Sequence, residues 1–326
     1  MTDIKNIFEK FSQKTVLVIG DVMIDAYLWG TVNRISPEAP VPIVSVDKKE
    51  QRMGGAANVA LNLKYLGAKP IIASVVGNDD AGDVFISLMG KRDLPIKGIV
   101  RSEERKTTQK TRVISDGQQL LRVDDEISNA LSLPLQKKFL QRIEQLITEE
   151  NIDIVIFEDY DKGVISKELI ADIVKIAQKE SVLTCVDPKK DNYDFYTAVN
   201  LFKPNFKEFT EGIKKDIAKN DVETIFLEAQ KIIKEKKYQY LMVTLSEYGV
   251  FISDGKTYHI IPAERRQIAD VSGAGDTVIS VAALLLASSV NMQDIAKYSN
   301  IAGGLVCEKV GVVPIEKQEL LSEILG

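Results

Sequence analysis

Residues 268–289 read IADVSGAGDTVISVAALLLASS, a turn of small residues that leads into an apolar run. Two glycines, Gly273 and Gly275, come just before Asp276, and an apolar run typical of a buried helix follows. The N-terminus of a helix is electropositive because its first backbone N–H groups are unpaired and its peptide dipoles align. Glycine also lets the backbone approach a phosphate without interference from a Cβ atom. The stretch therefore predicts a turn that binds a polyanion and holds a carboxylate beside it, although an ordinary helix cap would look the same.

The composition is typical of a globular protein without a general affinity for polyanions. The chain has 326 residues, of which 45% are hydrophobic and 27% charged, and its net charge is −5. This length suits one large α/β domain with an appendage, or two domains. Binding to nucleic acid or to an anionic membrane usually needs a basic field. We therefore expect no nucleic-acid or membrane partner, and an anionic substrate must meet local positive groups.

Several protein classes are disfavoured by what the sequence lacks. No basic region followed by an apolar segment and a cleavage site opens the chain, so we expect a cytoplasmic protein. The apolar run at residues 278–287 is too short to cross a bilayer. Cys185 and Cys307 lie in apolar contexts typical of buried packing. The single histidine, His259, excludes a multi-histidine metal site within one chain.

Strand-like and helix-like segments alternate along most of the chain. Strands are predicted at residues 16–20, 70–77, 153–160, 182–188, 198–205 and 240–255. Helices are predicted at residues 57–66, 81–88, 135–149, 167–179, 222–236, 277–288 and 292–308. This alternation predicts an α/β fold with a mostly parallel sheet covered by helices on both faces.

Two stretches break the alternation, at residues 27–46 and 106–125. Both are rich in β-branched residues and turn signals, and Asp116 followed by Gly117 marks a hairpin. We expect the two stretches to pair with each other in a small sheet over one edge of the main domain, where the sheet would act as a lid.

The two common nucleotide-binding patterns are absent. The sequence contains no G-x-x-x-x-G-K-[ST] motif, and the predicted strand ending at Gly20 has no glycine-rich continuation. A second small-residue turn, GGAAN at residues 54–58, instead precedes a predicted helix. A hydroxylated ligand could approach its backbone and the Asn58 amide, and Asp25 could accept hydrogen bonds from sugar hydroxyls. A capped glycine turn and a solvated loop carboxylate are the structural alternatives.

Together the two turns resemble the signatures of the ribokinase-like (PfkB) family of carbohydrate kinases. GGAAN, with Ala60, Gly67 and Gly77, is similar to the first signature, and DVSGAGD at residues 270–276 is similar to the second. The resemblance extends over residues 16–314. It implies a three-layer α/β/α fold with a β lid, in one kinase domain over residues 1–326.

Further strings resemble one branch of this family, the D-glycero-D-manno-heptose 7-phosphate kinases that form the kinase part of ADP-heptose synthase. These are GDVMIDAYLWG, RISPEAPVPIV and GGAANVALNLKYLGA. The resemblance implies ATP-dependent phosphorylation of O1 of the heptose 7-phosphate, giving the 1,7-bisphosphate used for lipopolysaccharide precursors. Some relatives continue into a nucleotidylyltransferase domain with an H-x-G-H motif. This sequence has no such motif, so we expect a separate protein to supply that step.

The resemblance also implies a role for each matching residue. Asp276 matches the family's catalytic base, and the backbone of Gly273, Ala274 and Gly275 matches its anion hole for the transferring phosphoryl group. The residues that match sugar contacts are Asp25, Gly54, Gly55 and Asn58. The residues that match nucleotide-binding positions are Asn205, Glu208, Thr244, Gly249 and Asn300.

Metal and substrate roles are implied for the remaining polar residues. Asn205 and Glu208 fit the family's N-x-x-E element, in which Glu208 helps to organise Mg²⁺ through water, and Asp187 is a second candidate metal ligand. Lys162 and Lys189 resemble the branch's substrate-lining residues, with a solvated surface as the alternative. Arg34 is the expected partner of the 7-phosphate, because a guanidinium binds phosphate bidentately, with a lid salt bridge as the alternative.

ATP and Mg²⁺ are the implied cofactors, and dependence on a monovalent cation stays open. The small-molecule partner is a sugar phosphate, and the resemblance implies a homodimer formed through the lid. Two other functions are kept beside the heptose kinase. One is a kinase for another sugar or a nucleoside, and the other is a non-catalytic nucleotide or sugar sensor, which would have no need of the base.

Overall fold

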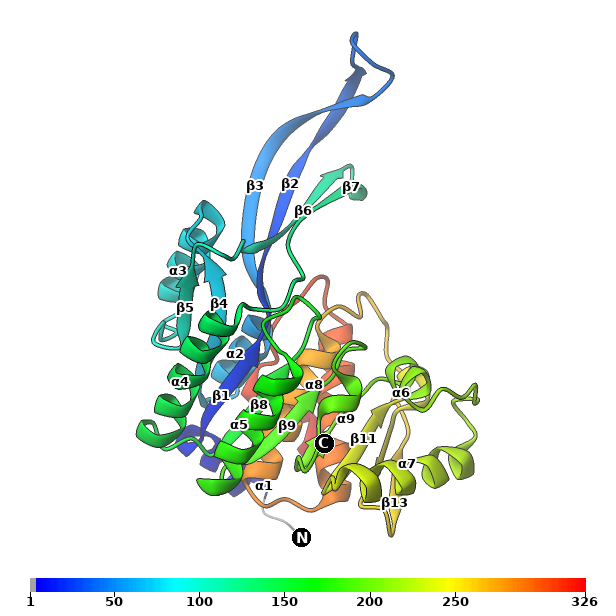
Figure 1. Ribbon diagram of the computed structural model, residues 1–326. Coiled ribbons are helices and arrows are strands. Elements are labelled where there is room, and N and C mark those ends of the chain that lie inside the picture. The colour runs from blue at the N-terminus through cyan, green and yellow to red at the C-terminus, as the bar shows by residue number, and fades with distance from the viewer. Residues whose placement is uncertain (1–3) are drawn as a thin grey trace.

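A computed structural model describes residues 4–326 and has three layers, with helices on both faces of a central sheet (Figure 1). Within this range the sheet has nine strands in the order β13-β12-β11-β10-β9-β8-β1-β4-β5. Strands β11 to β5 in this order are parallel, and β12 and β13 are added antiparallel. The bounds are β1 (Thr15–Gly20), β4 (Lys69–Gly77), β5 (Ile99–Ser102), β8 (Ile154–Glu158), β9 (Leu183–Asp187), β10 (Leu201–Phe202), β11 (Tyr240–Thr244), β12 (Val250–Ser253) and β13 (Tyr258–Ile261). The expected α/β/α fold is confirmed.

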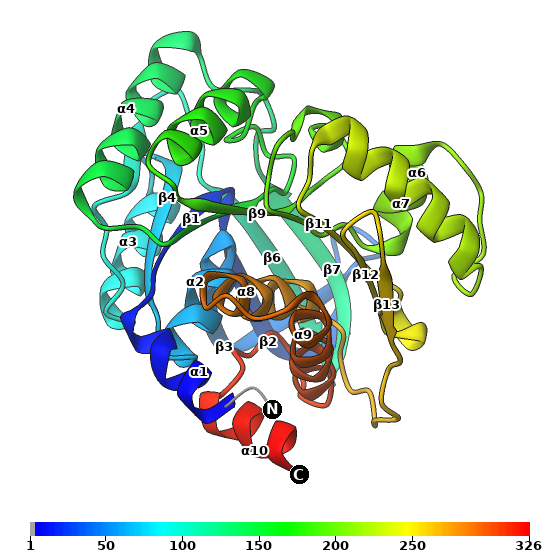
Figure 2. The same ribbon diagram turned by 90° about the horizontal axis from the view of Figure 1, so that it is seen from below.

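The helices divide between the two faces of the sheet, as Figure 2 shows from below. One face carries α4 (Leu133–Glu149), α5 (Lys167–Lys179), α6 (Phe206–Ile213) and α7 (Val222–Lys236). The other carries α1 (Ile4–Lys10), α2 (Ala56–Tyr65), α3 (Asp80–Lys91), α8 (Ala274–Ala287), α9 (Met292–Cys307) and α10 (Lys317–Leu325). Among the described residues no helix is long and apolar enough to cross a membrane.

Strand alternation builds the two hydrophobic cores. In β1, Val16 and Val18 pack with α2 and α8, whereas Leu17 and Ile19 pack with α4 and α5. Successive side chains of a strand point to opposite faces, so a strand that is apolar at every position can fill both cores. Helix α8 is buried along most of its length between α2 and α9, which fixes the direction of its N-terminus.

Some element boundaries differ from the sequence prediction. Helix α8 begins at Ala274 rather than at residue 277, so half of the glycine turn is helical. Strand β10 has only two residues, and Asn205 caps the following helix α6 through a capping box. The stretch 240–255 is two antiparallel strands joined by a tight turn. The elements α1, α6, α10 and β5 were not predicted, because each is short.

The lid is a four-stranded sheet that projects from the body of the molecule (Figure 1). Its order is β3 (Pro42–Gly55), β2 (Val22–Ile35), β6 (Thr108–Ser115) and β7 (Gln118–Asp125). The two unusual sequence stretches do pair, through parallel β2 and β6. Asp116 and Gly117 both have positive φ, 49° and 77°, as expected for the tight turn between β6 and β7. The lid strands begin directly after β1 and run to the start of α2, so they extend beyond residues 27–46.

Candidate active site

The glycine turn places Asp276 in the first turn of α8. Gly273 caps the helix with φ of +80°, a left-handed conformation that favours glycine. The Asp270 carboxylate steadies the turn by accepting the N–H groups of Ser272 at 2.9 Å and Gly311 at 3.1 Å. Asp276 is 6% exposed and its Oδ1 accepts the phenol O–H of Tyr160 at 3.0 Å. The carboxylate thus lies beside the free N–H groups of a helix N-terminus.

Three neighbouring parallel strands carry a charged residue at their last position or directly after it. Two residues before Glu158, Asp187 and Lys203, respectively, Ile156, Cys185 and Leu201 belong to the core on the α8 side. Strand alternation therefore puts Glu158, Asp187 and Lys203 on that side as well. The sequence prediction missed Glu158 and Lys203, although a charge directly after a fully buried strand was the available signal.

Lys203 and Asp187 form a buried ion pair beside the predicted anion hole. Lys203 is 2% exposed, and its Nζ lies 2.8 Å from Asp187 Oδ2. A Cβ atom added to Gly275 would lie 3.6 Å from Asp187 Oδ2 and 3.9 Å from Lys203 Nζ. The ammonium group therefore lies within a few ångströms of the first helical turn of α8, where a transferring phosphoryl group would need positive charge.

This charge arrangement sets the protonation of Asp276. Burial, followed by the negative charge of Asp187, raises the pKa of Asp276 to about 6. Hydrogen bonds from Tyr160 and Asn58 and the positive charge of Lys203 act in the opposite direction. Burial, Asp187 and Asp276 raise the pKa of Glu158 well above its usual range. Asp276 is thus ionised at neutral pH while remaining a better proton acceptor than a solvated aspartate.

The predicted sugar-contact residues lie together on one side of Asp276. Gly55 has φ of +63°, and a Cβ atom there would overlap the backbone carbonyl oxygen of Asp21. A Cβ atom at Gly54 would likewise overlap the Asp25 carboxylate. Asn58 is hydrogen-bonded to Asp276 and, with Asp25, lines a cavity of about 360 Å³, the sugar-side cavity, between the lid, α2 and residues 312–314. Asp25 lies within strand β2 rather than in a loop.

Three of the five predicted nucleotide-contact residues line a second cavity, of about 610 Å³, the nucleotide-side cavity; Asn205 and Glu208 are not among its lining residues. Thr244 and Gly249 reach it from the β11–β12 turn, Asn300 from α9, and Ala274 and Gly275 from α8. Gly303 and Gly304 form part of its wall on α9. The first turn of α8 therefore borders this cavity, while Asp276 is bonded to a residue of the sugar-side cavity.

The N-x-x-E element is a reciprocal helix cap. The Asn205 side chain accepts the Glu208 N–H at 2.9 Å, and Glu208 Oε2 accepts the Asn205 N–H at 2.8 Å. Glu208 Oε1 accepts a hydrogen bond from Lys189 Nζ at 2.8 Å, and Lys189 also lies 3.9 Å from Asp187. Both carboxylate oxygens of Glu208 are engaged, which fits an outer-sphere, water-bridged contact to a metal better than direct ligation.

The structure describes no ready-made metal cage. Within residues 4–326, no group of three or more histidine, cysteine, aspartate or glutamate side chains is arranged to hold a metal ion. Mg²⁺ is commonly held by one or two carboxylates, water and substrate phosphates. Asp187 and Glu208 therefore fit a magnesium ion that arrives with a nucleotide, not one bound by protein ligands alone.

Within one chain, Arg34 lies far from this site. It is exposed near the far end of β2, nine residues beyond Asp25, which corresponds to about 30 Å along a strand. Lys162 lines neither of the two cavities, and its Nζ pairs with Glu126 at 2.7 Å. The cations beside Asp25 are instead Arg112, which pairs with it at 2.5 Å, and Arg52, directly opposite it on β3.

These two arginines share one face of the lid with Asp25. Arg52 and Arg112 lie 5.2 Å and 5.4 Å from the centre of the Tyr27 ring, and Tyr27 lines the sugar-side cavity with Arg52 and Asp25. The sequence prediction missed them because it considered the distinctive RISPEAP string and not the alternating side-chain pattern of paired strands.

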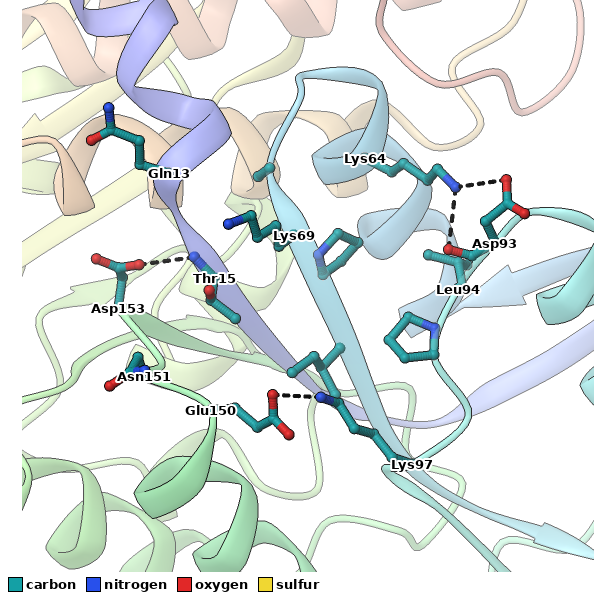
Figure 3. A pocket seen from close by; sticks show the side chains of 14 residues that line it. Gln13, Thr15, Lys64, Lys69, Asp93, Leu94, Lys97, Glu150, Asn151 and Asp153 are labelled. Carbon is teal, nitrogen blue, oxygen red and sulfur yellow. Dashed lines mark hydrogen bonds and ion pairs between the residues drawn. The ribbon is translucent and has the colours of Figure 1, made fainter.

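Another cavity, of about 720 Å³, lies at the amino ends of β1 and β4, and Figure 3 shows its lining. Thr15 and Lys69 at the starts of β1 and β4 line it, together with loop residues before β8. Its charges are largely paired internally, as Lys97 pairs with Glu150 at 2.5 Å and Lys64 with Asp93 at 3.4 Å. Ligands of parallel α/β sheets bind at the carboxyl ends of the strands, so the size of this groove does not mark it as the active site.

Residues 13–318 match the sequence model of the pfkB family carbohydrate kinases. The chain belongs to this family. In this pfkB carbohydrate kinase, Asp276 belongs to the second of the two turns, and Asn58 of the first turn is hydrogen-bonded to it.

Curated relatives of this pfkB kinase include bifunctional protein HldE from several bacteria. The protein from Sulfurimonas denitrificans is 38% identical over 305 residues, which cover 94% of this chain and 63% of the relative. The protein from Helicobacter pylori is 40% identical over 310 residues, covering 94% and 65%. The chain thus spans less than two thirds of the length of these relatives.

Solved pfkB-type structures share the fold. Phosphofructokinase-2 from Escherichia coli in complex with potassium superposes with a TM-score of 0.77 at 19% identity, covering 95% of this chain and 97% of that one. Ribokinase from Arabidopsis thaliana, complexed with ribose and ATP, superposes with a TM-score of 0.73 at 16% identity, covering 95% and 98%. At these identities the likeness shows the fold alone.

Proposed function

We propose that this carbohydrate kinase transfers the γ-phosphoryl group of ATP to O1 of D-glycero-D-manno-heptose 7-phosphate, a step toward ADP-heptose and lipopolysaccharide precursors. The observation that carries the proposal is that Asp276, at the start of α8, directly follows Gly275 of the nucleotide-side cavity and is hydrogen-bonded to Asn58 of the sugar-side cavity. The identity to proteins named HldE, 34–40% in several bacteria, and the sequence strings of the heptose kinases support this choice of sugar.

The chemistry follows from the charges around Asp276. The acceptor hydroxyl gives its proton to the Asp276 carboxylate as its oxygen attacks the γ-phosphorus and the bond to the β-phosphate oxygen breaks. The N–H groups at the start of α8 and the Lys203 ammonium stabilise the charge on the transferring group. Mg²⁺, when bound, supplies further neutralisation of the phosphates, with Asp187 and Glu208 as the residues that would hold it, Glu208 through water.

The substrate's own phosphate would bind to the lid rather than near Arg34. Arg112 and Arg52 offer two planar guanidinium groups beside Asp25, and a guanidinium suits bidentate binding of phosphate. Asp25 would then accept hydrogen bonds from sugar hydroxyls while Arg112 turns toward the phosphate.

The assembly and conditions of the reaction form part of the same proposal. The lid strand β7 is exposed throughout, with Leu121 57% and Val123 49% exposed. This supports a homodimer formed through the lid, which sedimentation would test. We place the reaction in the cytoplasm, where ATP is supplied, and a potassium dependence is to be tested because a related structure contains that ion.

The decisive experiment measures ADP release with Mg²⁺·ATP and a panel of acceptors. The panel contains both anomers of heptose 7-phosphate, free heptose, fructose 6-phosphate, ribose and adenosine. We expect strong activity only with one heptose 7-phosphate anomer. Activity with another sugar alone would replace the heptose assignment, and silence across the panel from folded protein would indicate a sensor rather than an enzyme.

A further inference from the structure

Tyr160 connects the loop after β8 directly to the carboxylate of Asp276. Its phenol O–H donates to Asp276 Oδ1 at 3.0 Å. The two residues are 116 positions apart in the sequence, and Tyr160 is not part of either signature turn. No role in substrate contact is needed to explain its position.

The backbone of this loop is held by a buried carboxylate. Asp21, which is 1% exposed, follows β1 and accepts the N–H groups of Tyr160, Lys162 and Val164, each at 3.1 Å. The Arg105 guanidinium lies 4.0 Å from Asp21. Three N–H bonds to one desolvated carboxylate leave little freedom to the peptide that carries the Tyr160 side chain.

The neighbouring residue and the ring itself are held as well. Asp159 accepts hydrogen bonds from Asn192 at 2.9 Å and from the Tyr196 phenol at 3.0 Å. Lys189 Nζ lies 5.6 Å from the centre of the Tyr160 ring, within the range of a cation–π contact. The phenol oxygen is thus presented to Asp276 from a fixed backbone and a supported ring.

We propose that Tyr160 is a positioning residue that fixes the orientation of the Asp276 carboxylate for proton transfer. The terminal torsion of an aspartate has a broad energy minimum, so the carboxylate plane is set by its hydrogen-bond donors. A general base must present an oxygen within hydrogen-bond reach of the acceptor hydroxyl. The phenol donates to Oδ1 and, together with the hydrogen bond from Asn58, it sets the plane of the carboxylate. This proposal rests on the proposed kinase function.

The test is Tyr160→Phe in the full chain. This change removes only the hydroxyl and keeps the ring over Lys189 and the backbone bonds to Asp21. We expect kcat to fall ~10–100-fold, the range of misorienting a catalytic group. KM for ATP and for the sugar phosphate should stay within about twofold, because no binding contact is lost.

Tyr196→Phe is the matched control, because it removes a buried phenol hydroxyl that donates to Asp159 in the same loop. We expect it to lower the unfolding temperature while kcat falls less than about threefold, since the bond to Asp276 is kept. Tyr160→Phe with kcat within twofold of the parent, or with KM for ATP rising as kcat falls, would overturn the proposal.

Crystal structures test the positioning role of Tyr160 without depending on kinase activity. In crystal structures of the parent and Tyr160→Phe, we expect the plane of the Asp276 carboxylate to rotate in the variant only. An unchanged plane overturns the positioning role. A parent that phosphorylates no sugar refutes the proposed function instead, while the two structures still decide whether Tyr160 holds Asp276.

Discussion

Lowering the pH from 8 to 5 should suppress turnover by protonating Asp276. Burial and the nearby charge of Asp187 raise the pKa of Asp276 to about 6, and only the ionised form accepts a proton. A group with this pKa is ~99% ionised at pH 8 and ~10% ionised at pH 5. We therefore expect kcat to fall about tenfold across this range, with the loss centred at or above pH 6, because bound ATP adds negative charge.

The assay is ADP release at saturating ATP and sugar phosphate. A sugar phosphate itself titrates near pH 6, so the Asp276→Asn variant is the control. Any loss of its residual activity at low pH comes from protonation of the substrate. In Lys203→Met, kcat should begin to fall at a higher pH than in the parent, because the Lys203 ammonium lowers the pKa of Asp276. A kcat that is flat from pH 5 to 8, or a loss at low pH that is identical in Asp276→Asn, would refute this account of the base.

Three further outcomes are expected. Asp276→Asn should lower kcat ~10²–10⁴-fold with a small effect on ATP binding, measured by steady-state kinetics and calorimetry; near-normal turnover would contradict the assignment. Arg112→Ala should raise KM for the sugar phosphate at least ~10-fold and leave KM for ATP unchanged. Arg34→Ala should change neither KM, and the reverse pattern would favour Arg34 as the partner of the phosphate. Gly55→Ala should lower the free energy of unfolding by ~1–3 kcal/mol, because its φ is positive and a Cβ would overlap a carbonyl oxygen. In the same thermal-melt series Gly90→Ala, a helical position open to solvent, should be neutral or stabilising.

The parts of the site that the sequence predicts are those in which the backbone itself is constrained. Gly273 and Gly55 need conformations that few other residues adopt, so their positions leave a local trace in the sequence. Asp276 follows one of these turns directly, and its place at a helix N-terminus could be inferred from the apolar run behind it. The α/β class followed in the same way from the alternation of buried strands and amphipathic helices.

The remaining parts depend on which strands become neighbours. Glu158, Asp187 and Lys203 face one another only because β8, β9 and β10 are adjacent and in register. Tyr160 meets Asp276 across 116 residues, and no local pattern encodes that contact. The assignment of Arg34 followed a distinctive string, yet the distance along β2 from Asp25 is set by strand geometry rather than by sequence similarity.

Strands β2 and β3 of the lid join the central sheet and α2 at a single point, so the lid can rotate about its base. Only Asp21 separates β1 from β2, and its carbonyl accepts the Ala56 N–H at 2.9 Å where β3 returns to the body. The fourteen residues of β2 extend about 45 Å from this attachment point, and Asp25 lies about 10–15 Å along the strand from it. A rotation of about 5° would therefore move the tip by roughly 4 Å and Asp25 by only about 1 Å. A large displacement of the outer hairpin would thus shift the Asp25 carboxylate, the proposed sugar contact, by only about 1 Å.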